Sequence, residues 1–347
     1  MKAAWLVALA IACKSEQAPP PPGASAARGF GVVAEIRGTA TLVAGTRRIA
    51  LRAGTAWYES EAGALVDKPA LGAAIAREET ALGGVVDVFL GSTPIVVGGE
   101  EHHEAHVRLT PAREDVALDG LATKIVTMRD GRELWAYTHE LSKLVAVISG
   151  PTASPPAVFE QIGPPAESAS PVSKRLCEAP HVQDLAVSDR AAYALVTECN
   201  DEAPLRLVTF DGGKPIETRL PSRKELVIAF ELLAVSRGGT AYLVGVRDRR
   251  LAIDRLANGV ESQTFDRVAR VFAAVVADDD AVWTLVLDER GTSVVLRDGK
   301  RVELGDGRTA TALGLDDKLG VVVLARGARA MWLLAEHPGA PVVIVPR

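Results

Sequence analysis

From Phe30 onward the chain is a succession of short apolar runs rich in Val, Leu, Ile and Thr, separated by short polar segments. Apolar runs of four to eight residues bounded by turn residues predict β-strands. Many of the polar segments contain a residue pair that tolerates the positive φ angles of a tight hairpin turn. These pairs are Asp119-Gly120, Asp130-Gly131, Asp211-Gly212, Asn258-Gly259, Asp298-Gly299 and Asp306-Gly307. The pattern therefore predicts an all-β body built from antiparallel hairpins.

Patterns typical of helices are scarce, and the best one runs from Pro69 to Leu82. Asp67 precedes it as a candidate N-cap, Pro69 falls in its first turn, and Gly83 follows its last residue. Proline at the start and glycine just past the end are typical helix boundaries. We expect one helix here.

An internal repeat sets the expected architecture. Leu185–Ser188 followed by Ala192–Leu195 aligns with Leu233–Ser236 followed by Ala241–Val244. Three further copies begin at Lys124, Ala274 and Leu313, and the steps from Tyr193 to Tyr242, Trp283 and Val322 are 49, 41 and 39 residues. Each copy continues into a third and a fourth apolar run, so the repeating unit is a group of four strands.

Four antiparallel strands about every 40–45 residues resemble the blade of a β-propeller. The length of the body implies about seven four-stranded blades, expected over 30–66, 67–117, 118–176, 177–226, 227–268, 269–307 and 308–347. The aromatic residue in the second strand of several copies is expected to pack between blades; these residues are Trp135, Tyr193, Tyr242 and Trp283. The Gly-His and Trp-Asp signature of WD40 repeats and the kelch diglycine are missing from the sequence, so no subfamily follows.

Two regions interrupt the repeat. Because the expected helix lies within residues 30–117, this part is either the first two blades or a separate small β domain beside a five-bladed propeller. Residues 150–174 contain six prolines among serines and alanines and are expected to be an insertion within one blade.

The amino terminus carries an export pattern. Lys2 precedes ten apolar or small residues, Ala3–Ala12, which suit a signal peptide over residues 1–12 and are too few to span a bilayer. The sequence Ala10-Ile11-Ala12-Cys13 resembles the lipobox of bacterial lipoproteins, although Ala10 stands where leucine is commonest. The resemblance implies a diacylglycerol on the Cys13 thiol and attachment to a membrane. The alternative is a plain secretory signal with an incidental cysteine.

Residues 13–29 include four successive prolines and predict an extended tether between the lipid and a folded body spanning residues 30–347. Lys14 follows the cysteine, where aspartate signals inner-membrane retention in enteric lipoproteins. This favours the outer membrane of the cell envelope, facing the periplasm or the surface.

Charge and cysteine usage fit this picture. The formal net charge is −5, and arginines and glutamates are interspersed without a basic stripe, so nucleic acid is not an expected partner. Apart from Cys13, the two cysteines are Cys177 and Cys199. An even pair in an exported protein predicts a disulfide, with two separate thiols as the alternative.

Few residues suggest chemistry. The segment from Glu100 to His106 contains His102, His103 and His106, which are candidate Zn²⁺ ligands, although a solvated charged loop is the favoured interpretation. Acidic residues also recur between the first and second strands of the repeat and would gather on one rim of a propeller; they are Asp189, Asp278–Asp280 and Asp316–Asp317. Calcium would suit such carboxylates, but ordinary turn chemistry is the favoured explanation.

The sequence contains no nucleophile elbow and no phosphate-binding loop. We therefore assign no catalytic residue and no cofactor, and we do not expect an enzyme. The sequence favours a lipid-anchored envelope module that binds or assembles an envelope protein or polymer through its rim loops. The alternative is an exported metal-dependent hydrolase or lyase that uses the cluster from His102 to His106.

Overall fold

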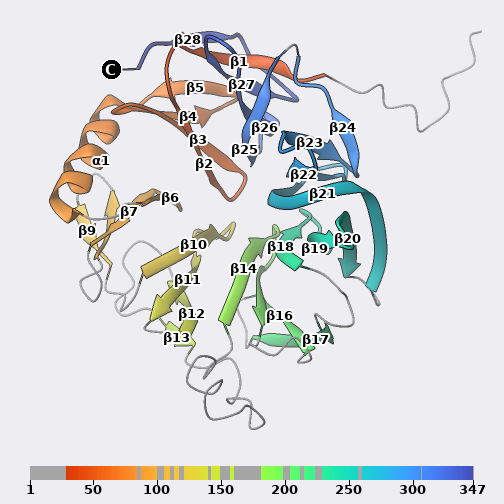
Figure 1. The fold of residues 1–347 in the computed structure, drawn as a ribbon. Helices are drawn as coiled ribbons and strands as arrows, with labels where there is room; N and C mark the ends of the chain where they lie inside the picture. The colour runs from red at the N-terminus through yellow and green to blue at the C-terminus, as the bar shows by residue number, and fades with distance from the viewer. Residues whose placement is uncertain are drawn as a thin grey trace, which may run out of the picture.

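A computed structural model describes residues 29–83, 87–99, 105–109, 113–116, 121–139, 142–148, 157–159, 181–197, 204–211, 215–222, 229–256, 260–305 and 307–346. Within these residues the elements are one helix and a long series of strands that wrap around a central axis into a ring of small sheets (Figure 1). Five of the sheets are one blade each, and the seven-stranded sheet comprises two blades. The strands of a blade follow one another outward from the axis (Figure 1). The predicted all-β fold, a propeller with seven blades, is confirmed.

The first four blades are separate four-stranded antiparallel sheets. The first blade contains β2 (Thr41–Gly45), β3 (Arg48–Ala53), β4 (Ala56–Glu61) and β5 (Ala64–Asp67), and the second contains β6 (Asp87–Leu90), β7 (Pro94–Gly98), β8 (Ala105–Leu109) and β9 (Arg113–Asp115). The third contains β10 (Leu121–Thr127), β11 (Glu133–His139), β12 (Ser142–Ile148) and β13 (Ala157–Phe159). The fourth contains β14 (His181–Val187), β15 (Ala192–Thr197), β16 (Pro204–Phe210) and β17 (Ile216–Ser222).

The fifth and sixth blades share one long strand. The fifth contains β18 (Ala229–Val235), β19 (Ala241–Arg247) and β20 (Arg250–Leu256), and the sixth contains β22 (Val282–Asp288), β23 (Ser293–Arg297) and β24 (Lys300–Val302). β21 (Val260–Val276) pairs with β20 through its first half and with β22 through its second half. Its register shifts between Val268 and Arg270, and such a bulge bends a strand, here from the outside of one blade to the inside of the next.

The last blade joins the two ends of the chain. It consists of β25 (Thr309–Asp316), β26 (Gly320–Arg326), β27 (Met331–Ala335), the N-terminal strand β1 (Gly31–Ile36) and β28 (Val342–Ile344). β1 runs antiparallel to β27 and parallel to β28. The prediction that residues 30–66 form the first blade was therefore wrong for β1, which belongs to the seventh blade. A repeat that is followed along the chain cannot reveal a pairing between the two ends of the chain.

The helix α1 (Pro69–Leu82) forms as predicted and ends at Gly83, whose φ is 65°. Its N-cap is Lys68 without a side-chain cap, whereas Asp67, the predicted candidate, ends β5. α1 lies between the first two blades and buries Ile75 in the same cluster as Trp57 and Val96. The residues around it thus form two blades of the ring, with the helix inserted between them (Figure 1).

The apolar core lies mainly between neighbouring blades. Trp135 of the third blade packs with Ile95 and Val97 of the second, and Trp283 of the sixth packs in a cluster with Leu313 of the seventh. Both indoles are at most 2% exposed. The expected packing role of these aromatic residues is confirmed. Each such contact joins the β-sheets of two neighbouring blades, so the blades stabilise one another.

Candidate functional site

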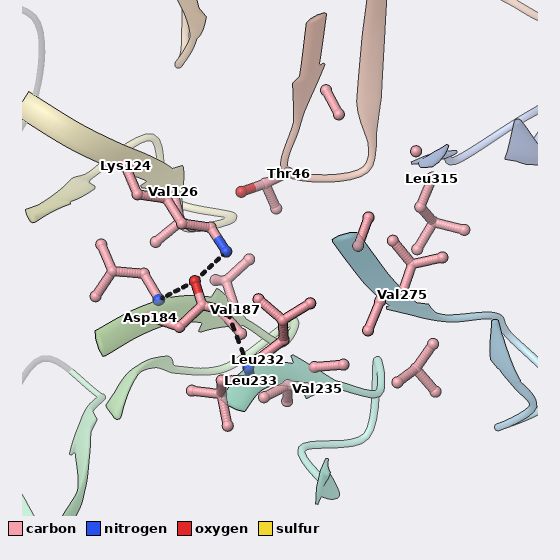
Figure 2. Close-up of a pocket in the computed structure, with 18 of the residues that line it drawn as sticks. Thr46, Lys124, Val126, Asp184, Val187, Leu232, Leu233, Val235, Val275 and Leu315 are labelled. Carbon is pink, nitrogen blue, oxygen red and sulfur yellow. Dashed lines mark hydrogen bonds and ion pairs between the residues drawn. The ribbon is translucent and has the colours of Figure 1, made fainter. Parts of the chain in front are cut away.

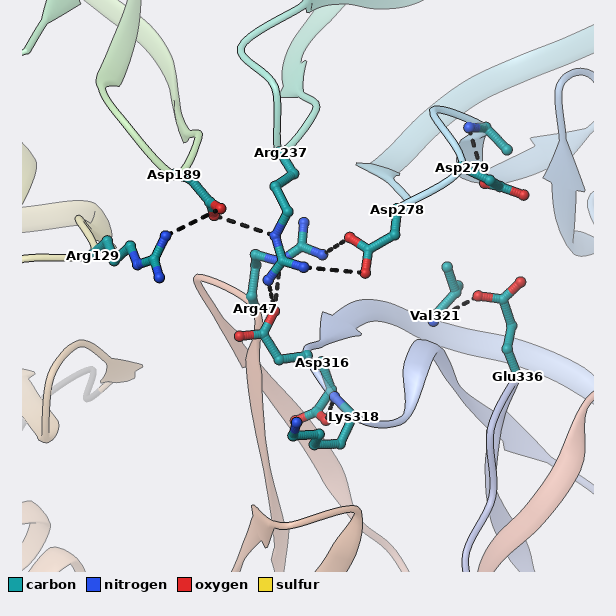
Figure 3. A network of polar contacts seen from close by, with 12 residues as sticks. Arg47, Arg129, Asp189, Arg237, Asp278, Asp279, Asp316, Lys318, Val321 and Glu336 are labelled. Atoms are coloured by element: carbon teal, nitrogen blue, oxygen red, sulfur yellow. Dashed lines mark hydrogen bonds and ion pairs between the residues drawn. The ribbon is translucent and has the colours of Figure 1, made fainter.

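On one face of the ring, the turns between first and second strands meet around Arg237 (Figure 3). The Arg237 guanidinium lies 3.3 Å from Asp189, 3.4 Å from Asp278 and 2.9 Å from Asp317, each in a different blade. We call this set of contacts, with the arginines described next, the rim network. It connects the turns of the fourth, fifth, sixth and seventh blades.

Two more arginines extend the rim network. Arg47, from the first blade, donates to Asp317 at 2.7 Å and also to Asp278, and Arg129, from the third blade, lies 3.6 Å from Asp189. Burial by itself lowers the pKa of Arg237, but the charges of the surrounding aspartates raise it above its ordinary value. The three arginines and three aspartates of the rim network have formal charges that balance.

The acidic turns thus gather on one rim as expected, but their carboxylates are paired with guanidinium groups. Asp279 likewise pairs with Arg297, and Asp316 accepts the amides of Lys318 and Leu319 at 2.9 Å, which is ordinary turn chemistry. No group of three or more potential metal ligands occurs among the residues that the structure describes. We interpret the rim network as a set of ion pairs between blades that holds the ring together.

Behind the rim network the central channel contains a cavity of about 250 Å³ (Figure 2). Its wall is formed by the innermost strands β2, β10, β14, β18, β21 and β25. Most of the wall is aliphatic, with side chains that include Val126, Val187, Leu232, Val235 and Val275. Arg47 belongs to both the wall and the rim network, so the network forms that end of the cavity.

Lys124 and Asp184 are the oppositely charged pair in this wall (Figure 2). The Asp184 carboxylate accepts the amide of Leu185 at 2.8 Å and, across the blade boundary, the amide of Leu233 at 2.8 Å. It also pairs with the Lys124 ammonium. The register of the inner strand shifts just before both residues, at Thr123 and Gln183. These bulges occur at the same place in the repeat and aim the following side chain toward its neighbours.

A second concave region lies on the opposite face of the seventh blade. β25 runs from Arg308 toward the rim network, so Arg308 and the β26–β27 turn are at the other end of the blade. Arg37, Arg308 and Arg329 line this cleft, of about 920 Å³, together with Glu35 and Trp332. We call it the basic cleft. The Arg308 guanidinium carbon stands 4.4 Å from the centre of the Trp332 ring, and its Nη1 donates to the Leu304 carbonyl at 3.1 Å. These two contacts orient the Arg308 side chain.

His106 lies on β8 and packs into the boundary with the third blade. Its side chain is 2% exposed, its Nε2 accepts the amide of Ala122 at 3.2 Å, and its ring meets Trp135 edge-on at 5.7 Å. The structure thus uses one nitrogen of His106 to join two blades. His102 and His103 lie outside the described residues, so the metal site stays a prediction.

Next to His106 is a buried ion pair. Arg108 donates to both carboxylate oxygens of Glu133, at 3.0 Å and 2.6 Å, and both side chains are 2% exposed. Glu133 also accepts the amide and the hydroxyl of Ser92, at 2.7 Å and 2.8 Å, and the Trp135 indole N–H at 3.1 Å. Burial alone raises the pKa of Glu133, but Arg108 and Ser92 together bring it below its usual value. The pair joins the second and third blades.

The remaining sequence-based sites lie outside the described residues: Cys13, Cys177 and Cys199. Lipidation and the disulfide therefore stay predictions. The described part of the chain contains no helix that is long and apolar enough to cross a bilayer.

Sequence reasoning missed the arginines of the rim network, although a signal existed. In the first turn of the repeat, one position is an arginine in three blades and an aspartate in two others. These residues are Arg47, Arg129 and Arg237, and Asp189 and Asp278. Comparing charge at one position across copies would have revealed complementary turns. The basic cleft had no such signal, because its arginines come from three separate segments of the chain.

Comparison with known proteins gives a fold and no family. No family model matches the chain, and no curated protein matches it. Among solved structures, YCF48 bound to a D1 peptide is similar over 88% of this chain and 94% of that chain, with 10% identity and a TM-score of 0.52. The WD40 β-propeller domain of Doa1 is similar over 88% of this chain and 97% of that chain, with 11% identity and a TM-score of 0.51. The chain is a β-propeller.

Proposed function

We propose that this protein is a binding module of the bacterial cell envelope and that the basic cleft is its contact surface. The observation that carries the proposal is the cleft itself: it is lined by three arginines and a tryptophan, in a chain whose formal net charge is −5. Arginine donors recognise carboxylates through paired hydrogen bonds, and arginine and tryptophan are enriched at the energetic centres of interfaces. The partner that suits this chemistry is an acidic segment of an envelope protein.

The two faces of the ring differ in how their charges are used. In the rim network the arginines are neutralised by aspartates from other blades. In the basic cleft, Glu35 lies 3.6 Å from Arg37, whose side chain is 64% exposed, and such an exposed pair is weak. Among the described residues, Arg329 forms no ion pair. The cleft therefore retains positive charge for a partner.

A propeller is a rigid support for such a surface, because the loops of separate blades are fixed relative to one another. The similar structure of YCF48 contains a D1 peptide, so one propeller of this size is known in complex with a peptide. Fold alone does not assign a partner, and the proposal for this chain rests on the basic cleft.

The proposed anchor fits this geometry. Gly31 pairs with Ala335 at the end of β27, on the same face as the rim network. A lipid on Cys13 and an extended tether over residues 14–29 would reach up to about 50 Å at ~3.1 Å per residue. Attachment on this face would leave the basic cleft, on the opposite face, free to point away from the membrane.

The binding proposal can be tested by photo-cross-linking in cells. A benzophenone amino acid placed at Ala328, in the exposed β26–β27 turn of the cleft, should give a recurrent protein adduct. The same probe at Ile216, which is 56% exposed on the outer strand of the fourth blade, should not give that adduct. Charge reversal by R37E/R329E should abolish the adduct, whereas R267E, at an arginine outside the cleft paired with Glu289, should not.

Identical adducts from Ala328 and Ile216, or an adduct that survives R37E/R329E, would contradict a role for the cleft. A polysaccharide adduct in place of a protein would assign the cleft to an envelope polymer. The anchor is tested separately by intact mass analysis of the mature protein and by C13A, which should move the protein from the membrane fraction to the soluble fraction. An unmodified mature terminus would remove the anchor and leave the cleft to be judged by cross-linking alone.

A further inference from the structure

The central channel carries a second inference, independent of the basic cleft. We propose that the channel binds a small aliphatic carboxylate, with its carboxylate at Lys124 and its hydrocarbon chain along the aliphatic wall toward the rim network. The proposal rests on the size of the cavity, the composition of its wall and the hydrogen-bonding capacity of Lys124.

The two ends of the cavity differ in their residues. Arg47 lines the end at the rim network, where it is paired with Asp278 and Asp317. Phe272 belongs to the wall near the other end, where its side chain is 44% exposed, so solvent reaches this end of the cavity. Lys124 lies nearer the accessible end, because β10 runs from Lys124 toward the turn that contains Arg129.

The wall between these ends is mainly aliphatic and suits a hydrocarbon chain. Valines and leucines from five inner strands face the cavity (Figure 2). A dry apolar cavity of about 150 Å³ holds a benzene molecule. On that scale 250 Å³ accommodates a molecule of about ten non-hydrogen atoms, which is the size of octanoate.

The polar end of the ligand should be an acceptor with negative charge. The Lys124 side chain is 43% exposed, and an ammonium group offers three donors, of which Asp184 takes one. The Asp184 carboxylate already accepts two backbone amides besides Lys124, so it has little capacity left for a cationic ligand. Lys124 therefore offers donors at the end of the cavity where the carboxylate of the ligand is proposed to lie.

The test is calorimetric titration of the full-length mature protein with hexanoate, octanoate, decanoate and octylamine. Octanoate should bind about 15-fold more tightly than hexanoate, since each buried methylene contributes about a fourfold gain in affinity. Each of the two further methylenes of decanoate should raise the affinity by much less than about fourfold, because octanoate already fills the cavity. Octylamine, which places a cation beside Lys124, should bind at least tenfold more weakly than octanoate.

Two variants separate the roles of charge and space. K124M should remove the preference for octanoate over octylamine. A44F should abolish binding by filling the cavity from an exposed wall position while leaving Lys124 and Asp184 in place. K300M, on the outer strand β24, is the matched lysine control and should bind like the unaltered protein. Thermal unfolding of each variant identifies any that fails to fold.

Equal affinities for octanoate and octylamine, unchanged binding in folded A44F, or no saturable binding of octanoate would each overturn the proposal. None of these results bears on cross-linking at the basic cleft. Likewise, loss of the cleft adduct in R37E/R329E leaves the channel untouched, so the two proposals fail separately.

Discussion

The buried ion pair between Arg108 and Glu133 leads to the sharpest stability prediction. E133Q keeps the size and one carbonyl oxygen of the side chain but removes its negative charge. The buried Arg108 cation then keeps a weaker ion pair with the partly exposed Glu114, 3.7 Å from its Nε. Both side chains are 2% exposed, and Arg108 donates to both carboxylate oxygens of Glu133. Removing one partner of a buried pair typically costs about 3–5 kcal/mol. We expect a loss of that size in the free energy of unfolding at pH 7.

The same pair predicts a pH dependence with a definite sign. The pKa of Glu133 is below its usual value in the folded protein, and an unfolded glutamate titrates near ~4.3. The unfolded chain therefore takes up a proton on Glu133 before the folded chain does as the pH falls. The stabilisation from Glu133 is fully present above ~4.3 and is lost as the pH falls through the lowered pKa of the folded state. The difference between the original protein and E133Q should shrink in the same range.

Urea unfolding followed by tryptophan fluorescence between pH 7 and pH 3 measures both effects. E261Q is the matched control, because Glu261 is 67% exposed and lies 3.4 Å from Arg255; we expect a change within about 0.5 kcal/mol. R108M/E133Q should recover much of the loss, since it removes the unpaired cation. A loss below about 1 kcal/mol for E133Q, or a difference that stays constant down to pH 3, would refute this account of the pair.

Three further variants test the packing of the ring. G91A should lower the urea midpoint, because a Cβ there would stand 2.4 Å from the Glu133 Oε1; an unchanged midpoint would show that the loop can move aside. D184A should reduce the free energy of unfolding by about 1–3 kcal/mol, as it leaves the Leu233 amide without its acceptor, and a change within experimental error would argue against this contact. R237A should cost about 1 kcal/mol or less, with a smaller effect in 1 M salt than in 0.1 M salt, since its carboxylate partners are more than 30% exposed; a salt-independent loss would contradict the electrostatic role.

The sequence supported the fold well because a propeller repeats one local unit. The strand pattern, the turn pairs and the aromatic position of each copy depend on residues close together in the chain. Asp298 and Gly299 illustrate this: both have positive φ, 45° and 72°, as a two-residue hairpin turn requires. Ring closure by β1 and the shared strand β21 depend on pairing between blades, which no local pattern encodes.

Candidate sites were harder to predict for the same reason. The chemistry that looked most specific along the chain was a run of histidines, yet His106 serves as an acceptor between two blades. Lys124 and Asp184 are 60 residues apart and meet only because their blades are neighbours. A charged residue in a predicted strand is expected on the surface from sequence alone, whereas its actual contacts depend on which face of which blade it occupies.

The placement of arginines gives a physical criterion for separating structure from function in this ring. Where carboxylates from several blades surround a guanidinium, as at Arg237, the charges satisfy one another and the result is a fixed clasp. Where a guanidinium is oriented by an aromatic ring and a backbone carbonyl, as at Arg308, its position is fixed while its charge is not neutralised by those contacts. Fixed but unneutralised charge is the arrangement that a binding surface needs, since a partner then gains electrostatic attraction without having to order the side chain. By this criterion the rim network holds the ring together, and the basic cleft is the surface that we propose for a partner.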